Sequence, residues 1–185
     1  MRTAIFDLET SSLYANTGII LCAAIKGYDQ EKVTVIRADE FKSWKTGKSD
    51  NKEVVKAVMA ALEPYQIFVA HNGQYFDKTF LNSSCLKYGL RPSLRFEKFI
   101  DPVLIARRHL RLARNSLASI IDYFDIEDTK TPISFDHWMK ASLDGNRKAM
   151  GYIVDHCVVD VKALEKVYDI TKSLVKGIDD GGSSR

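Results

Sequence analysis

The sequence predicts an α/β fold, with one sheet of about five strands, helices on both sides of the sheet and a helical C-terminal part. Three observations lead to this class: three strand-like segments come first, two more alternate with helices, and the rest of the chain shows helical spacing only. The chain has 185 residues, of which 45% are hydrophobic, so it can bury one sizeable core. We predict a single domain over residues 1–176 and a flexible tail over residues 177–185, where Asp, Gly and Ser dominate.

Three strands are expected in the first part of the chain. Residues 2–9 begin with an apolar run, and residues 18–25 are apolar enough to form a central strand. Residues 32–37 alternate between apolar and polar side chains, as an outer strand paired with the second strand would. Residues 39–51 are polar, and we expect them to be irregular.

A helix, a strand and a second helix are expected next. Asp50 or Asn51 can cap the first helix, and Pro64 ends it. Residues 66–70 form the strand, and Gly89 stops the helix that follows. The first helix has apolar residues at helical spacing: Val54, Val55, Val58, Ala61 and Leu62.

A fifth strand and several helices complete the chain. Residues 96–100 have strand character, and the pair Asp101-Pro102 opens a helix. Beyond residue 115 the pattern is helical, with helices predicted over three ranges: residues 116–124, 134–141 and 146–175.

Charge and composition restrict the function classes. The formal net charge of +3 is too small to indicate a nucleic-acid partner by itself. Two groups of basic residues are present. Arg107, Arg108, Arg111 and Arg114 suit a polyanion and a solvated helix face equally, whereas a mobile loop is the favoured interpretation for Lys42, Lys45, Lys48 and Lys52.

No apolar stretch approaches the roughly 20 residues that span a membrane, and no signal pattern is present at the start. The three cysteines are odd in number and far apart, which predicts free thiols in a reducing compartment: Cys22, Cys85 and Cys157. We therefore expect a soluble cytoplasmic protein with no membrane partner.

The first strand carries the most informative motif, Asp7-Leu8-Glu9-Thr10. Successive side chains on a strand alternate between faces, so Asp7 and Glu9 point the same way. Two adjacent carboxylates repel each other, and burial without partners raises their pKa values. A divalent cation relieves this repulsion, and Mg²⁺ and Mn²⁺ prefer oxygen ligands. The pair predicts half of a metal site, although such a pair on an exposed strand is usually only solvated.

Two further motifs contain acidic residues. The segment from His71 to Leu81 follows a short apolar run, and its turn chemistry leads into a helix with Asp77 in the first turns. Near the C-terminus, His156 and Asp160 are four residues apart in a helical pattern, so they share a helix face.

Three acidic motifs in this order, spanning residues 2 to 170, resemble the DnaQ-like (DEDD) family of 3′–5′ exonucleases. This resemblance implies an RNase H-like mixed sheet of about five strands. The four acidic positions of the family match four residues of this chain: Asp7, Glu9, Asp77 and Asp160. By resemblance, Asp7 bridges two metal ions, Glu9 and Asp160 complete the tighter metal site, and Asp77 acts through the water around the second ion.

The resemblance implies metal-dependent hydrolysis of phosphodiester bonds from the 3′ end of nucleic acid, with single-stranded DNA as the preferred substrate. Two Mg²⁺ or Mn²⁺ ions about 3.5–4 Å apart stabilise charge on the attacking and leaving oxygens in such reactions. Thr10, Asn72 and Phe76 lie where the family binds the substrate near its 3′ end. Replication or repair proteins are the further partners that this activity suggests.

The chain departs from the family near the last acidic residue. One branch of the family has Tyr four residues before the last Asp, and another has His five residues before it. This chain has His156 four residues before Asp160, which combines the residue of one branch with the spacing of the other. An imidazole suits a general base at neutral pH, so we predict this role for His156.

Several other candidates are interpreted as structural. Asp101 resembles the Asp that closes the fifth strand in many relatives, and we expect a cap or a supporting residue rather than a metal ligand. His71, His109 and His137 match no family position, and Tyr152 is expected to pack.

Two alternative functions remain open. A binding module for nucleic acid or protein would keep the fold without the chemistry, although such a module does not need to gather four carboxylates. A haloacid-dehalogenase-type phosphatase would use Asp7 as a nucleophile, but Glu9 is one methylene longer than that motif requires.

Overall fold

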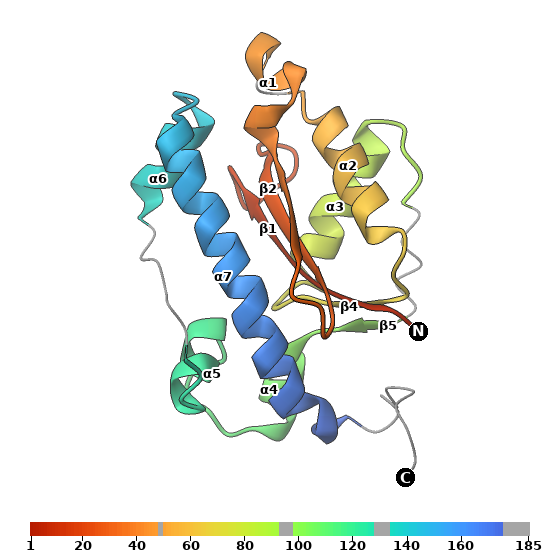
Figure 1. The fold of residues 1–185 in the computed structure, drawn as a ribbon, viewed down its shortest axis with the longest axis vertical. Coiled ribbons are helices and arrows are strands. Elements are labelled where there is room, and N and C mark those ends of the chain that lie inside the picture. The colour runs from red at the N-terminus through yellow and green to blue at the C-terminus, as the bar shows by residue number, and fades with distance from the viewer. Residues whose placement is uncertain (48–49, 93–97, 128–133, 176–185) are drawn as a thin grey trace.

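The computed structural model describes residues 1–185 except residues 48–49, 93–97, 128–133 and 176–185. Five strands form one mixed sheet in the order β3-β2-β1-β4-β5 (Figure 1). This confirms the predicted fold class. The strand bounds are β1 Thr3–Thr10, β2 Ile20–Gly27, β3 Val33–Arg37, β4 Ile67–Val69 and β5 Lys98–Ile100.

β1 is the central strand of the sheet, and its two neighbours differ in direction and in how much of β1 they pair with. β2 runs antiparallel along the whole strand, with Asp7 opposite Ala24 and Glu9 opposite Cys22. β4 runs parallel and pairs only with the first part of β1, up to Ile5. The second half of β1, which carries the Asp7–Glu9 motif, therefore extends beyond β4 and is free to contact other elements on that side.

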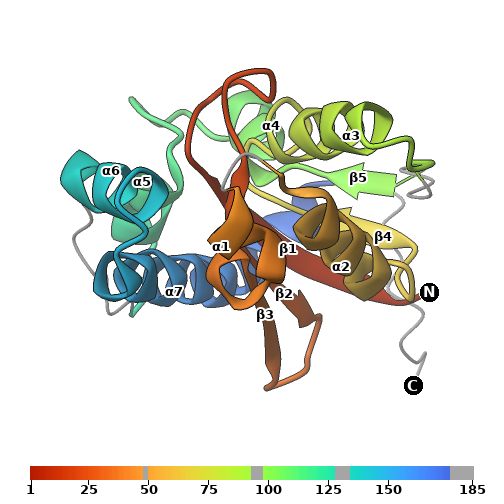
Figure 2. The same ribbon diagram turned by 90° about the horizontal axis from the view of Figure 1, so that it is seen from above.

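Helices cover both faces of the sheet (Figures 1 and 2). α2 and α3 pack on one face, α7 packs on the other, and α6 packs against α7. The helix bounds are α1 Lys42–Thr46, α2 Lys52–Leu62, α3 Asp77–Lys87, α4 Pro102–His109, α5 Leu117–Tyr123, α6 Phe135–Ser142 and α7 Arg147–Thr171, with 3-10 turns η1 Ala38–Glu40 and η2 Lys172–Leu174.

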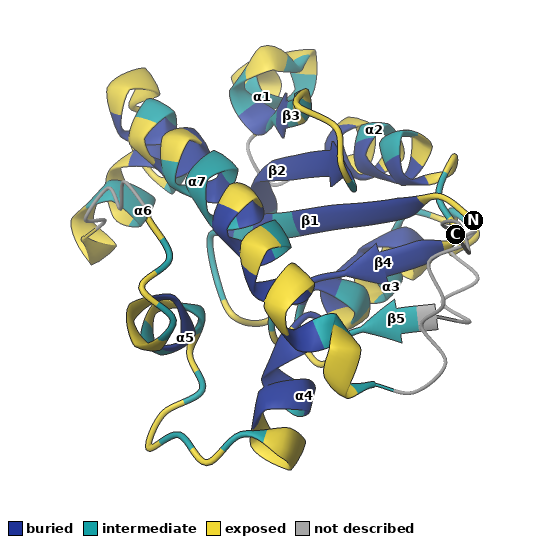
Figure 3. Cartoon of the chain, turned by 60° about the horizontal axis from the view of Figure 1, so that its bottom comes forward, coloured by how far each residue is buried: buried dark blue, intermediate teal, exposed yellow. Residues whose placement is uncertain are grey.

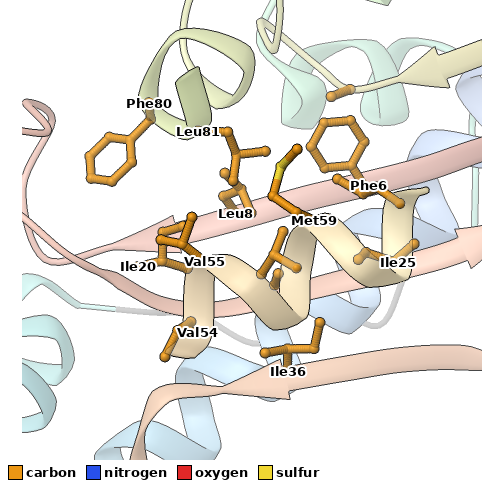
Figure 4. Close-up of a cluster of buried hydrophobic side chains, with 14 of the residues drawn as sticks. Phe6, Leu8, Ile20, Ile25, Ile36, Val54, Val55, Met59, Phe80 and Leu81 are labelled. Atoms are coloured by element: carbon orange, nitrogen blue, oxygen red, sulfur yellow. The ribbon is translucent and has the colours of Figure 1, made fainter. Parts of the chain in front are cut away.

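The alternation of β1 divides its side chains between two cores. Phe6 and Leu8 belong to the cluster under α2 and α3, which Figure 4 shows with Val55, Met59 and other apolar side chains. Ile5 belongs to the cluster under α7. Asp7 and Glu9 share the parity of Ile5, so both carboxylates face α7, as the strand pattern predicts.

A third cluster joins the helices beyond the sheet. Ala106 of α4, Ile120 and Ile121 of α5, and Ala163 and Val167 of α7 pack together. Figure 3 shows that β1, β2 and β4 are mostly buried, whereas the outer surface of α5 is exposed.

One segment contradicts the sequence prediction. Residues 39–51 were expected to be irregular, but part of this stretch forms η1 and α1. Two aromatic side chains three residues apart, Phe41 and Trp44, pack against the core and hold these short turns in place. The prediction of irregular structure relied on the many polar residues of the segment and gave no weight to Phe41 and Trp44.

The cap of α2 also differs in detail. Asn51 occupies the N-cap position, but its side chain makes no capping bond. Its Oδ1 instead accepts from Ile20 N at 2.8 Å, and its Nδ2 donates to Ile20 O at 3.0 Å. Asp50 Oδ1 accepts from Lys52 N at 3.1 Å, so Asp50 supplies a bond at the start of the helix while Asn51 ties α2 to β2.

Other local predictions are confirmed. Gly89 adopts a φ of 66° just after α3, a conformation that favours glycine. The three cysteines are free and buried. Among the described helices, none has the length and apolar character needed to cross a membrane. The predicted tail over residues 177–185 and the start of the strand predicted over residues 96–100 lie outside the described residues.

Candidate active site

Asp7 and Glu9 lie on β1 beneath α7, and both are only partly exposed. The Cys157 thiol of α7 lies 3.3 Å from Asp7 Oδ2 and 3.5 Å from the Asp7 backbone oxygen. The contact joins the central strand to the long helix at the level of the first carboxylate. Sequence reasoning missed it, because residues 150 positions apart carry no local signal of their proximity.

Asp77 reaches the same strand from the other side. It is the first residue of α3 and is 1% exposed, and its Oδ1 accepts a hydrogen bond from Leu8 N at 3.0 Å. This bond occupies the part of β1 that extends beyond β4. Asp77 is thereby placed next to the Asp7–Glu9 motif, as its match to the second family motif suggests.

The turn before α3 determines where Asp77 lies. Asn72 adopts a left-handed φ of 58°, which Asn tolerates better than most residues. A Cβ on Gly73 would lie 2.3 Å from the Cβ of Ala70 and 2.9 Å from the Phe99 ring, so this position requires glycine. The sequence His71-Asn72-Gly73 thus allows the chain to turn tightly from β4 into α3.

His156 and Asp160 share a face of α7, as their spacing predicts. His156 Nε2 lies 3.5 Å from Asp160 Oδ2, and the side chains are 23% and 22% exposed. The other ring nitrogen of His156, Nδ1, is buried and has no hydrogen-bond partner. His156 is therefore oriented toward the last of the four acidic residues.

The pKa shifts link Asp7 electrostatically with the three other predicted carboxylates, Glu9, Asp77 and Asp160. Burial and, next, the charge of Asp160 raise the pKa of Asp7 to about 7. Burial and the charge of Asp7 raise the pKa of Glu9 to about 9. Burial and Asp7 also hold the pKa of Asp77 well above its usual range. The anions of Asp7, Glu9 and Asp77 are thus destabilised first by burial and then by neighbouring carboxylates, and the second effect is the repulsion that the sequence predicted.

α6 contributes a residue that sequence reasoning did not assign to the site. Trp138 Nε1 donates to Glu9 Oε2 at 3.2 Å, and the Trp138 ring meets His156 edge-on at a centroid distance of 6.5 Å. His137, its neighbour on α6, stacks obliquely on Tyr152 at 4.9 Å, in agreement with the structural roles predicted for these two residues. Apart from the aromatic character of Trp138, no local signal marks its contact with Glu9.

A pocket of about 490 Å³ adjoins Glu9, and it contains two of the three predicted substrate-binding residues. Thr10 and Phe76 line it together with Phe135 and Trp138. Asn72 is exposed and does not line this pocket, but its backbone oxygen accepts a hydrogen bond from Phe76 N at 3.0 Å, which keeps it next to Phe76 at the start of α3.

Asp101 has the capping role predicted for it. Its carboxylate accepts from Val103 N at 3.1 Å at the start of α4, and also from Asn72 N at 2.9 Å and Gln74 N at 3.1 Å. It therefore fixes the turn that leads to Asp77. His71 is also structural: its Nε2 lies 3.1 Å from the oxygen of Asn115.

The chemistry of the donor set fits a hard divalent cation. Four carboxylates supply only oxygen donors, which Mg²⁺ and Mn²⁺ prefer. Burial raises the pKa of the Cys157 thiol well above its usual range, which favours the protonated thiol over a soft thiolate. Within the described residues, no three His, Cys, Asp or Glu side chains are already arranged to hold a metal ion. The four carboxylates therefore fit a divalent cation by their oxygen donors and their negative charge.

Comparison with known proteins identifies the class. The chain belongs to the RNase H superfamily, whose family model matches residues 4–172. Nucleases of this superfamily generally use divalent metal ions, so membership is consistent with the carboxylate cluster.

Among solved structures, the chain is similar to a family B DNA polymerase from the hyperthermophilic archaeon Pyrobaculum calidifontis, with a TM-score of 0.73 and 14% identity. The match covers 92% of this chain and 24% of the polymerase, so this chain spans about a quarter of that protein's length. At 14% identity, this similarity supports the assignment of the fold alone. No curated protein matches the sequence.

Proposed function

We propose that this protein is a metal-dependent 3′–5′ exonuclease that hydrolyses phosphodiester bonds of nucleic acid, with single-stranded DNA as the preferred substrate. The observation that carries the proposal is the electrostatic coupling of Asp7 with Glu9, Asp77 and Asp160. Three separate elements bring these like charges together. Gathering them costs stability, and a binding surface for a polyanion has no use for them.

In this proposal, two divalent ions, Mg²⁺ or Mn²⁺, would be held by the four carboxylates and would stabilise charge on the attacking and leaving oxygens. Asp7 and Glu9 from the central strand, Asp77 from α3 and Asp160 from α7 would be the residues that hold these ions. Trp138 would hold the Glu9 side chain through its hydrogen bond.

His156 is proposed as the general base that takes a proton from the attacking water. Its place on the Asp160 face of α7 supports this role. Its Nε2 must then turn from Asp160 toward the water, next to the Trp138 ring that meets it edge-on. The preference for single strands follows from the pocket beside Glu9, because Phe76 and Trp138 can contact a terminal base only if that base is unpaired.

The experiment is a time course on 5′-labelled single-stranded DNA, blunt duplex DNA and RNA, with Mg²⁺, with Mn²⁺ and with a chelator. We expect a descending ladder on single-stranded DNA, slower cleavage of the duplex and no cleavage in chelator. Asp7→Asn should remove cleavage. Asp122→Asn, an exposed carboxyl on α5 outside the cluster, serves as the matched control and should cleave like wild type.

The same experiment decides between the proposal and the alternative of a catalytically silent binding module, which would retain the labelled strand without shortening it. The phosphatase alternative is wrong, since the chain belongs to the RNase H superfamily. Because the fold also occurs within a DNA polymerase, replication or repair proteins are the partners we propose beyond nucleic acid.

A further inference from the structure

A second pocket, of about 720 Å³, continues from the pocket beside Glu9. The two pockets share two lining residues, Leu13 and Phe76. The second pocket lies between residues 13–16, in the loop that joins β1 to β2, and one side of α3. Its volume is within the roughly 300–1,000 Å³ of small-ligand sites. The two adjoining pockets therefore form a groove that leads from Glu9 along α3.

The loop side of this groove presents apolar side chains from an ordered backbone. Leu13 is 76% exposed and Tyr14 is 70% exposed. Thr17 N donates to Tyr14 O at 3.1 Å, and the Ser12 and Thr17 hydroxyls lie 2.8 Å apart. A Cβ on Gly18 would lie 2.8 Å from the Cβ of Ser12, so the loop closes tightly. Hydrogen bonds within the loop therefore fix its backbone, while the side chains of Leu13 and Tyr14 stay exposed to solvent.

The helix side supplies a second aromatic face and a positive charge. Tyr75 is 63% exposed just before α3. Phe76 packs on Phe80 at a centroid distance of 5.9 Å, and Figure 4 shows Phe80 projecting from α3. Lys87 lies at the far end of α3 and is the only charged residue among those lining the second pocket, while Thr79 and Ser83 add hydroxyls between.

We propose that the second pocket binds the nucleotides that precede the 3′ end of a single-stranded nucleic acid, as a separate subsite from the pocket beside Glu9. Their bases stack on Tyr14 and Tyr75, and a backbone phosphate lies near Lys87. This inference rests on the proposed function for the direction of the strand. An aromatic groove with one cation and no carboxylate suits unpaired bases joined by phosphates.

The continuity of the two pockets favours nucleic acid over an apolar segment of a partner protein. A strand whose end lies beside Glu9 can leave past Leu13 and Phe76, the two residues that line both pockets, and it then enters the second pocket. Binding of an apolar protein segment would not require the second pocket to adjoin the pocket beside Glu9.

The test is binding of a 5′-fluorescein-labelled dT octamer, measured by anisotropy in chelator so that no cleavage occurs. Stacking of one base contributes about 1–3 kcal/mol by alanine substitution, so Tyr14→Ala and Tyr75→Ala should each weaken binding about tenfold. Tyr75→Phe keeps the ring and should bind like wild type. Tyr123→Ala is the matched control, because Tyr123 is equally exposed at 63% but lies on α5 outside both pockets.

Lys87→Gln gives an independent measurement. Loss of one phosphate contact should make the slope of log K against log salt shallower by about 0.7, the value for a single strand. If both alanine variants bind the octamer as tightly as wild type does, or if wild type does not bind it measurably, the subsite is overturned.

Failure of the active-site proposal gives a different result. The p-nitrophenyl ester of thymidine 5′-monophosphate reports hydrolysis beside Glu9 alone, because this small compound does not extend into the second pocket. Absence of hydrolysis by wild type with Mg²⁺ or Mn²⁺ would contradict the proposed function. Octamer binding that depends on Tyr14 and Tyr75 would in that case still support the subsite.

Discussion

Trp138 of α6 donates a hydrogen bond from Nε1 to Oε2 of Glu9 at 3.2 Å, across 129 residues of sequence. The bond lowers the pKa of Glu9 against the stronger effects of burial and Asp7. The indole of Trp138 also meets His156 edge-on. One side chain from a short helix therefore contacts both a proposed metal ligand and the proposed general base.

Loss of the indole donor should slow the reaction. Trp138→Phe keeps the ring beside His156 but removes the bond to Glu9. Because hydrogen bonds to charged groups contribute about 1.5–3 kcal/mol, we expect kcat on single-stranded DNA to fall by about tenfold to a hundredfold. Trp44→Phe, which changes the other tryptophan of the chain, is the control for folding. A kcat equal to that of wild type would show that Glu9 is held without Trp138.

The carboxylate cluster should make the metal-free protein less stable at high pH. The folded-state pKa of Asp7 is raised from 3.8 to about 7, so its contribution to stability is complete below pH 3.8 and is lost as the pH rises through 7. The pKa of Glu9 is raised from 4.5 to about 9, so the free energy of unfolding should continue to fall as the pH rises toward 9. Urea unfolding in chelator should show a lower free energy of unfolding at pH 8 than at pH 5.

Asp7→Asn should reduce this loss. The amide carries no charge, so the variant should exceed wild type at pH 8 by about 1 kcal/mol or more, whereas the two should differ less at pH 5. Asp122→Asn should follow wild type at both pH values, since Asp122 is exposed on α5. A variant that is less stable than wild type at pH 8 would contradict mutual repulsion in the cluster.

Divalent metal should reverse the instability. A ligand that binds only the folded state at 100 times its Kd contributes about 2.7 kcal/mol, which for a chain of this size corresponds to a Tm increase of about 5–10 °C. We expect this increase with Mg²⁺ or Mn²⁺ for wild type and a much smaller one for Asp7→Asn. Thermal unfolding followed by circular dichroism, with and without metal, measures the difference without reference to activity.

Replacement of His156 tests the proposed base. His156→Ala should lower the rate by about 10²–10⁴-fold, the usual size of the loss of a general base, while the Tm increase with Mg²⁺ stays near that of wild type. His156→Tyr restores the residue that relatives with this spacing use and should retain more activity than the alanine variant. A fast alanine variant would assign His156 to packing against Trp138 and Asp160 alone.

Several features could be predicted because they depend on geometry that repeats along the chain. A strand places side chains i and i+2 on one face, which put Asp7 and Glu9 together beneath α7. A helix places i and i+4 on one face, which put His156 beside Asp160. The element order and the mixed sheet followed from the same two periods and from the family resemblance.

Contacts between distant elements were decided by tertiary packing. The sequence alone did not indicate that Trp138 reaches Glu9, that the Cys157 thiol lies on Asp7, or that Asn51 pairs with Ile20 in place of capping α2. The short helix α1 is likewise stabilised by the packing of the Trp44 ring against the core. Backbone geometry sets which side chains share a face of one element, but the face that each element meets depends on how all of them pack, and no local pattern encodes that arrangement.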